Sequence, residues 1–473
     1  MISVKLIAKP EIPPLVAARQ AAETCYQPTL PEEEIENNEK TAKFVKNKLF
    51  NTGHHTTLQH SYFTFAIDGI AVGDVTLGLH LVNPHYNSSQ RSGRFCSYKY
   101  NDGEMEKVIS EYATYFWPEI TDEQLHIVLN RFKLGKKLYK ENIAKAMDLA
   151  EKALLRDRPY NRRFVEAKVT KIAQEQLRVF LPVILPTGLQ YTINLSALVA
   201  MWHAAFTPVL RYVTEEMRQQ IQNIFPELKF MFCSEKRRTV DWFCDYFINN
   251  PNSYQNDWSE KSPDIKSVEV SCVNGFSIPN YSLMYPVNML NFIPEMMDNH
   301  STIIVERGVT MSLCAMGQDQ RHRTIIRSEP YFTGKFYLPP LVSKLIKMGE
   351  LKPESIKNLF HGWLEKYSYF SNNLKTLWMI VAPYGAMVRY NKIGSLNAIS
   401  HEQAERLCWR SQEEIFHLGL CLRNLLKESY PQFLNLFEPY CFKTGHCIEG
   451  VNYCGRDLSL CSSPEMFFSK RLI

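Results

Sequence analysis

The sequence predicts an α+β fold made of two tandem domains, each a sheet packed with long helices, and a short cysteine-rich tail. The chain has 473 residues, which exceeds the ~100–200 residues of a typical single domain. Hydrophobic residues make up 45% and charged residues 22%, values that are ordinary for globular proteins. A polar stretch near the middle separates two halves that both begin with a strand-like segment.

The first half reads as strands with packed helices. Residues 3–7 alternate loosely, and residues 61–67 are rich in aromatic and β-branched side chains, so both are predicted strands. Apolar residues at three- and four-residue steps predict helices elsewhere. The expected helical stretches are 39–50, 122–155, 162–180 and 195–224.

The boundary between the halves is predicted in a polar segment that contains Asn249-Asn250-Pro251-Asn252-Ser253, a composition that favours turns. Residues 268–272 then resemble the opening strand, which indicates an internal repeat. The predicted division is a first domain at 1–235, a linker at 236–264, a second domain at 265–440 and a tail at 441–473.

Net charge and hydropathy limit the classes of partner that the sequence predicts. The net charge of +5 comes from 54 basic and 49 acidic residues without a long basic block, so a nucleic-acid arm is not expected, whereas small anions are suitable ligands. The N-terminus lacks the pattern of a signal peptide, and no run of ~18 apolar residues predicts a membrane span. A cytoplasmic protein without a membrane partner is therefore expected.

The densest polar motif is Gln318-Asp319-Gln320-Arg321-His322-Arg323, with Arg327-Ser328-Glu329 close behind. Arginine forks hold phosphates and planar oxygens bidentately and stay charged, so this run suits a nucleotide or a cofactor phosphate. A solvated basic loop or a structural ion-pair network explains the same residues equally well.

These residues resemble the hallmark of the flavin-dependent thymidylate synthases (ThyX), Arg-His-Arg followed by Asn-Glu and Ser-x-Arg. Arg321-His322-Arg323 and Glu329 match its first part, while Tyr331 and Thr333 replace the last serine and arginine. The first half shows the converse. Ser92-Gly93-Arg94-Phe95 is similar to the end of the motif, and Asn83-Pro84-His85 stands in place of Arg-His-Arg.

Further landmarks of the family occur in the same order. His54 to His60 resembles its histidine-containing lead into a strand, and Leu177-Arg178 with Thr192-Ile193-Asn194 resembles two later segments. In the second half Arg406, Gln412 and Glu414 keep the family spacing. The resemblance covers roughly residues 2–230 and 265–439.

The resemblance implies reductive methylation of dUMP, or a related pyrimidine nucleotide, to dTMP by FAD with NADPH and methylenetetrahydrofolate. It implies a homo-oligomer, here a dimer of the tandem chain. The alternative is a diverged nucleotide- or flavin-binding protein, or a pseudoenzyme, with the same fold. The implied catalytic residues are Arg321, Arg323 and Glu329, the substrate-binding residues Ser92, Arg94, Glu329, Arg406 and Gln412, and the cofactor-binding residues His54, His60, Arg321, His322 and Arg323.

Because each half keeps a different part of the motif, we predict one composite site. Arg321 to Glu329 would come from the second half, and Ser92 with Arg94 from the first. A site made from the other two parts, Asn83-Pro84-His85 of the first half and Tyr331 with Thr333 of the second, would lack both sets of motif residues.

The C-terminal region holds a second candidate constellation, Cys441, His446, Cys447 and Cys454, with Cys461 further on. Thiolates and an imidazole suit tetrahedral zinc, which could staple a short tail. The spacing is not the tight Cys-x-x-Cys pair, so unligated thiols and, more rarely, an iron–sulfur cluster stay open as alternatives.

Overall fold

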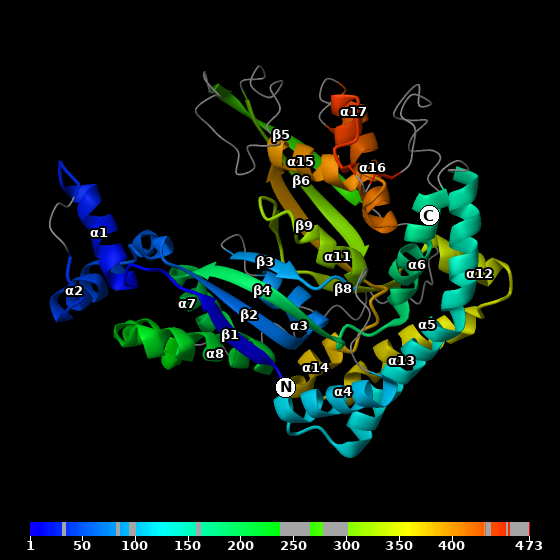
Figure 1. The fold of residues 1–473 in the computed structure, drawn as a ribbon, viewed down its shortest axis with the longest axis horizontal. Helices are drawn as coiled ribbons and strands as arrows, with labels where there is room; N and C mark the ends of the chain where they lie inside the picture. The colour runs from blue at the N-terminus through cyan, green and yellow to red at the C-terminus, as the bar shows by residue number, and fades with distance from the viewer. Residues whose placement is uncertain are drawn as a thin grey trace.

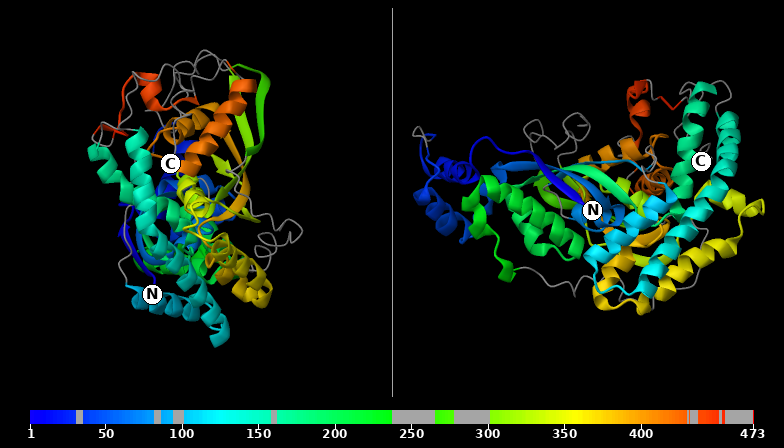
Figure 2. Two further views of the ribbon diagram at one scale, coloured as in Figure 1. Left: turned by 90° about the vertical axis from the view of Figure 1, so that its right-hand side faces the viewer. Right: turned by 60° about the horizontal axis from the view of Figure 1, so that its bottom comes forward.

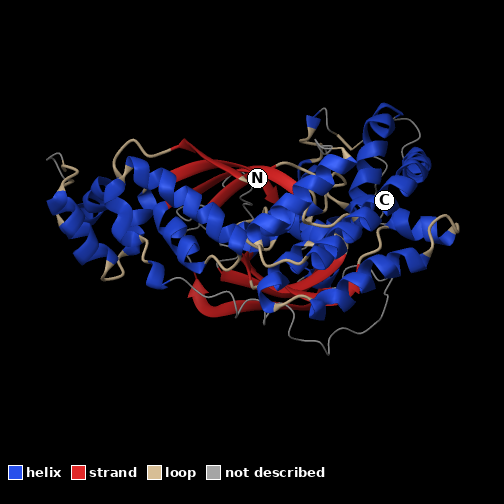
Figure 3. Ribbon diagram, turned by 90° about the horizontal axis from the view of Figure 1, so that it is seen from below, coloured by secondary structure: helices blue, strands red, loops and turns tan. Residues whose placement is uncertain are grey.

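The computed structural model confirms the α+β fold with two antiparallel sheets and numerous helices. Figure 3 shows the strands in two separate groups. None of the helices among the described residues is long and apolar enough to cross a membrane. The structure describes residues 1–30, 35–81, 86–93, 101–157, 162–236, 265–277, 301–429, 431, 437–450, 453–454 and 473.

The first sheet has the strand order β1-β2-β4-β3 and is antiparallel throughout. Its burial alternates along β2, with Phe63, Phe65 and Ile67 facing the core, as expected for a strand with one solvated face. The strands are β1 (Ser3–Ala8), β2 (Tyr62–Ala71), β3 (Tyr86–Gln90) and β4 (Pro186–Asn194).

The second sheet repeats this arrangement with the order β5-β6-β9-β7, and β8 also pairs with β9. Strand for strand, β5, β6, β7 and β9 occupy the places of β1, β2, β3 and β4. The bounds are β5 (Ile265–Ser277), β6 (Ser301–Ser312), β7 (Ile326–Arg327), β8 (Tyr331–Phe336) and β9 (Ala386–Ser395).

The four helical stretches predicted in the first half all form helices, one of them with a break, and a further helix at Asp102–Phe116 was not predicted. Residues 195–224 form two helices, because Thr207 caps a new helix that starts at Pro208, a residue favoured at the first helical position. Helices α1 and α2 lie at one end of the first sheet (Figures 1 and 2). The bounds are α1 (Pro14–Tyr26), α2 (Glu39–Phe44) with a π-helical turn at Val45–Phe50, α3 (Val72–Thr76), α4 (Asp102–Phe116), α5 (Asp122–Asp157), α6 (Arg162–Leu177), α7 (Leu195–Ala204) and α8 (Pro208–Ile224).

The second half has a comparable set of helices around its sheet. A short helix, α11, follows β6 as α3 follows β2, and α15 follows β9 as α7 follows β4. The bounds are α11 (Leu313–Asp319), α12 (Pro340–Lys347), α13 (Pro353–Glu365), α14 (Lys375–Ile380), α15 (Leu396–Arg406), α16 (Glu413–Ser429) and α17 (Tyr440–Thr444).

The two halves meet in a reciprocal backbone contact. Val183 N–H donates to Ala382 O at 2.9 Å, and Tyr384 N–H donates to Leu181 O at 2.8 Å. Pro182 and Pro383 face each other in an antiparallel bridge between these bonds. This arrangement relates the halves by an approximate two-fold axis at the bridge.

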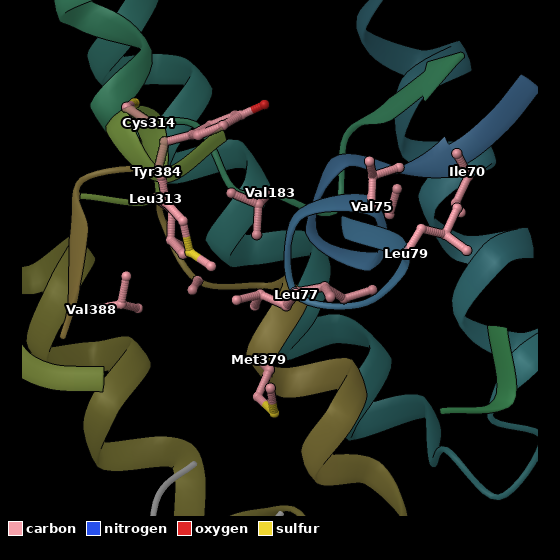
Figure 4. Packing of buried hydrophobic residues seen from close by; sticks show 14 of the residues in the cluster. Ile70, Val75, Leu77, Leu79, Val183, Leu313, Cys314, Met379, Tyr384 and Val388 are labelled. Atoms are coloured by element: carbon pink, nitrogen blue, oxygen red, sulfur yellow. The ribbon is translucent and has the colours of Figure 1, made fainter. Parts of the chain in front are cut away.

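A single apolar core runs across this contact and contains residues of both halves. Figure 4 shows Leu77 and Val183 of the first half in one cluster with Met379 and Tyr384 of the second. Trp117 Nε1 also donates across the interface to Thr376 Oγ1 at 3.0 Å. The interface is therefore a packed interior, and side chains from both halves can contribute to one site.

Candidate functional site

The segment Gln320–Glu329, named the cation loop below, connects α11 to β8 and lies against β3 of the first half. Arg323 Nη2 donates to Ser88 O at 3.1 Å and to Ser88 Oγ at 2.9 Å. The guanidinium also lies over the Tyr86 ring, 5.0 Å from its centroid. The cation loop is thus held on the first half by a bidentate hydrogen bond and a cation–π contact.

A cavity of about 310 Å³ opens beside this contact, between the halves. Its apolar wall comes from the first half, with Ala200, Met201 and Phe206 among its residues. The opposite wall belongs to the second half and includes Gln320, Arg327, Ser328, Glu329 and Tyr390. A mostly apolar cleft with a few convergent polar groups is the usual form of a small-molecule site.

His80 and Tyr86 complete the cavity on the first-half side. His80 stacks on Tyr86 with ring centroids 5.3 Å apart, and its Nε2 lies 2.9 Å from Ser88 Oγ. Burial, with a further contribution from the Arg323 charge, lowers the pKa of His80 to about 3. His80 is therefore a neutral hydrogen-bonding group at physiological pH.

A buried polar cluster, named the Arg178 cluster below, occupies the opposite side of α11. Arg178 belongs to the 3-10 turn after α6, and its Nη2 donates to Gln412 Oε1 at 2.8 Å and to Cys314 O at 3.2 Å. Gln318 Nε2 donates to the same Gln412 oxygen at 2.5 Å. A Cβ built on Gly93 would lie 3.7 Å from Arg178 Nη1, so the Ser92-Gly93 backbone borders this guanidinium.

Glu414 and Arg406 extend the Arg178 cluster within the second half. Glu414 accepts from Ser312 N at 2.6 Å and from the Ser312 hydroxyl, and burial raises its pKa to about 8. Arg406 Nη2 donates to Gln318 O at 3.0 Å. A cation, two amides and a carboxyl group with a raised pKa are therefore collected at one buried position, a pattern typical of functional sites.

The equivalent position across the two-fold axis has a different composition. Gly73 N–H donates to Val183 O at 2.7 Å, in the place where Cys314 N–H donates to Tyr384 O at 3.1 Å. Leu77 and Met379 are buried near this position (Figure 4), and Ile380 lies against Gly73. Asp74 and Thr76 are buried there as well, and Asp74 is hydrogen-bonded to Tyr112. One interface thus carries the Arg178 cluster, whereas its counterpart has Leu77 and Met379.

Several predicted site residues are brought together here. Glu329 lines the cavity, Arg323 joins the halves, and Gln412 and Arg406 lie in and beside the Arg178 cluster. Ser92 is half-buried next to Gly93.

Other predicted residues occupy different environments. Arg321 is exposed on the cation loop. His322 is buried against His401, with ring centroids 5.3 Å apart, and burial, together with the Arg406 charge, holds its pKa well below the ordinary value. His54 and His60 are exposed at the turn before β2 and are not among the residues that line the cavity. Arg94 and Asn83-Pro84-His85 lie outside the described residues.

Five residues of this region were not proposed as site residues from the sequence: Tyr86, Ser88, His80, Arg178 and Gln318. Gln318 stands three residues before Arg321, and Arg178 belongs to a segment that already resembled the family pattern. Gln318 and Arg178 could therefore have been proposed from the sequence. The remaining three join the site only through contacts between the halves.

The predicted metal set in the tail is not assembled. Among the residues that the structure describes, which include Cys441, His446, Cys447 and Cys454, no three His, Cys, Asp or Glu side chains are arranged to hold a metal ion. Cys441, Cys447 and Cys454 form no disulfide, and burial, with neighbouring thiols adding to it, raises the pKa of Cys441. The zinc site stays a prediction.

Comparisons with known proteins bear on this geometry. Solved structures similar to the chain include a UMP/dUMP methylase, PolB, from Streptomyces cacaoi bound with 5-Br dUMP, at 15% identity and a TM-score of 0.33, covering 49% of this chain and 94% of that one. Thymidylate synthase X from Helicobacter pylori with FAD and dUMP is 19% identical, with a TM-score of 0.31 and coverages of 49% and 97%. Likenesses of this size do not decide ligand or activity. No curated protein sequence matches the chain significantly.

The family model described as "Thymidylate synthase complementing protein" matches residues 6–229. The match spans β1 to the turn after α8 and so includes β3, Arg178 and the apolar wall of the cavity. Residues 6–229, just under half of the chain, are thus what resembles the family of flavin-dependent thymidylate synthases.

Proposed function

We propose that this protein is an FAD-dependent, thymidylate synthase-like enzyme that reductively methylates dUMP, or a related pyrimidine nucleotide, with methylenetetrahydrofolate and NADPH. The observation that carries the proposal is the pair of contacts between the halves that flank α11. Arg323 is bonded to Ser88 on one side, and Arg178 is bonded to Gln412 on the other. Cationic forks beside a ring-sized apolar cavity suit a planar, phosphate-bearing ligand.

The cavity residues fit part of a flavin. A volume of about 310 Å³ matches one ring system or a mononucleotide, so the remainder of an FAD would extend over the exposed Arg321. Phe206 and Met201 offer an apolar surface to a ring, and Gln320 and Ser328 offer polar groups at its edge. A bound flavin would supply the redox chemistry, which side chains cannot provide.

The Arg178 cluster suits the nucleotide. Gly93 brings its backbone close to the Arg178 guanidinium, and a side chain there would narrow the approach. Arg178 and Arg406 can neutralise a phosphate, while the Gln318 and Gln412 amides can orient a uracil edge. The predicted roles of Ser92 and Arg94, which neighbour Gly93 in the sequence, agree with this assignment.

The number of sites follows from the asymmetry between the two interfaces. Leu77 and Met379 offer neither charge nor hydrogen bonds at the position equivalent to the Arg178 cluster. We therefore propose one composite site in each chain, with the two halves acting as unequal tandem domains. We also propose a dimer of the tandem chain.

A role in binding without turnover is the second candidate. It is favoured by the departures from the family motif, because Tyr331 and Thr333 stand where that motif has serine and arginine.

The test is a visible absorbance spectrum of the purified protein, followed by an anaerobic assay with NADPH, methylenetetrahydrofolate and dUMP. We expect bound flavin and NADPH oxidation that depends on dUMP. Flavin without turnover would support the binding role. A colourless protein that cannot be loaded with FAD would contradict both candidates.

The matched variants are Arg321→Ala with Arg323→Ala, and Lys335→Ala as a control on the neighbouring strand β8. Removing two cations beside the cavity should weaken FAD binding by at least about tenfold, whereas the control should leave it unchanged. Equal affinities for all three proteins would show that the cation loop does not bind the cofactor.

A further inference from the structure

A row of three cations crosses the second sheet beneath the cation loop. Arg307 on β6 pairs with Lys392 on β9, and Lys392 pairs with Arg327 on β7. The three side chains are buried, with exposed fractions of 2%, 2% and 8%. Adjacent buried cations repel one another and lose hydration, so such a row persists only with buried anions beside it.

Asp319 and Glu402 supply those anions. Lys392 Nζ donates to both carboxylates, and Arg307 donates to Glu402. Asp319 also accepts from Arg327 Nε at 2.6 Å and from the Tyr390 hydroxyl at 2.9 Å. Asp319, the last residue of α11, therefore links the helix to β9 and to the cation loop.

Arg327, which Asp319 holds in place, in turn makes hydrogen bonds to backbone oxygens at the start of the cation loop. Its Nη1 donates to His322 O at 3.0 Å and to Ile325 O at 2.7 Å, and its Nη2 donates to Asp319 O. Four hydrogen bonds of one guanidinium thus fix the turn that carries Arg321 and Arg323. A lysine could not reproduce this fork.

We propose that Asp319 is a positioning residue: by holding Arg327 it sets where Arg321, Arg323 and Glu329 stand around the cavity. The ligand part of this inference rests on the proposed function, whereas the ordering of the loop does not. Burial alone would raise the pKa of Asp319, but the charges of Arg327 and Lys392 hold it well below its ordinary value. Asp319 is therefore a carboxylate that its cationic neighbours stabilise.

The test compares Asp319→Asn with Glu438→Gln in the full chain. Glu438 is a matched control, because it also pairs with a buried arginine, Arg423, at 2.7 Å, but it does not touch the cation loop. Amide hydrogen exchange across Gln320–Ser328 is measured first. These amides are protected by bonds such as Ile325 N to His322 O and Ser328 N to Asn391 O.

We expect Asp319→Asn to speed exchange in this segment by at least about tenfold while β2 and β4 keep their rates, because local opening exposes only the amides that it frees. Glu438→Gln should leave the cation loop unchanged. Unchanged loop exchange in Asp319→Asn, or an equal increase throughout the chain, would overturn the inference.

The second measurement is the binding of FAD and of riboflavin, which lacks the phosphates of FAD. If the loop positions cations for a phosphate, Asp319→Asn should weaken FAD binding about tenfold and riboflavin binding less than about twofold. An equal loss for both ligands would overturn the positioning role. If the unaltered chain binds neither ligand, the proposed function fails, and hydrogen exchange alone decides whether Asp319 orders the loop.

Discussion

The two sheets have the same strand order, but they differ at one row of residues that pair across neighbouring strands. In the first sheet the row is Phe65, Tyr191 and Ser88, and in the second it is Arg307, Lys392 and Arg327. In the first row Phe65 and Tyr191 are fully buried and Tyr191 stacks on Tyr86, whereas the second row joins cations to Asp319 and Glu402. The same backbone therefore supports a packed wall in one half and an anchored basic loop in the other.

The two interfaces beside the Pro182–Pro383 bridge also differ in polarity. The one around Arg178 is polar and borders Ser92-Gly93, while its counterpart around Leu77 and Met379 is apolar. If only one of the two interfaces binds a ligand, hydrophobic residues can fill the other. Buried apolar side chains stabilise the folded state, whereas a partly satisfied polar network does not. The asymmetry is thus consistent with one site per chain.

The largest effect is expected from breaking the charged row. Lys392→Met leaves Asp319 and Glu402 buried without their shared cation and should destabilise the protein by about 3–5 kcal/mol. The midpoint of urea denaturation measures this. A loss under about 1 kcal/mol would show that the row contributes little to stability.

A smaller effect on binding is expected at the polar interface. Arg178→Met gives it the residue found at its counterpart and removes a charged donor, which costs about 1.5–3 kcal/mol, or roughly 10- to 100-fold in dUMP affinity. Met379→Leu is the control, since a similar apolar volume should leave binding unchanged. Equal dUMP affinities for Arg178→Met and the control, measured by calorimetry, would remove Arg178 from the site.

The pH dependence of stability should distinguish two buried aspartates, one in each half. Asp319 is surrounded by cations, whereas Asp74 is bonded only to Tyr112 among its described contacts, at 2.8 Å, and burial raises its pKa to about 7. The folded state therefore holds a proton that the unfolded state releases near pH 4, so this group lowers stability as pH rises from about 4 to 7. Asp74→Asn should stabilise the protein by about 2–3 kcal/mol more at pH 8 than at pH 5. An equal gain at both values would contradict the account.

The smallest effect is expected in the aromatic row. Tyr191→Phe removes the hydrogen bonds from its hydroxyl to Leu79 O, at 3.0 Å, and to Met201 Sδ, at 3.7 Å, and keeps the ring stacked on Tyr86. A loss of about 1 kcal/mol is expected in urea denaturation. A loss as large as that of Lys392→Met would mean that the two rows do not differ in the way described.

Much of the fold was accessible from local sequence patterns. Periodicity and residue composition predicted β1, β2 and α5, because these features depend on residues close in the chain. The predicted linker lies almost wholly outside the described residues, so the domain division stays a prediction. The break before α8 could also have been predicted, since Thr207-Pro208 is a capping signal. The approximate two-fold axis could not, because it depends on Pro182 meeting Pro383.

The site was predictable only where one motif carried it. Arg323, Glu329 and Gln412 were identified from their spacing. The partner of Arg323 is Ser88, which is 235 residues away, and Lys392 reaches Asp319 through sheet pairing. Such contacts depend on tertiary packing, and their residues carry no local signal of a role. The tail cysteines show that residue types close in sequence do not by themselves establish a metal site, since no group of three possible ligands is found among the residues that the structure describes.

The central claim is that each chain holds one composite site built from both halves. Titration of the FAD-loaded chain with dUMP tests it most directly, because the count of bound nucleotide reports how many interfaces bind. The account predicts one equivalent per chain, lost in Arg178→Met. Two equivalents per chain, or one equivalent that survives in Arg178→Met, would contradict it.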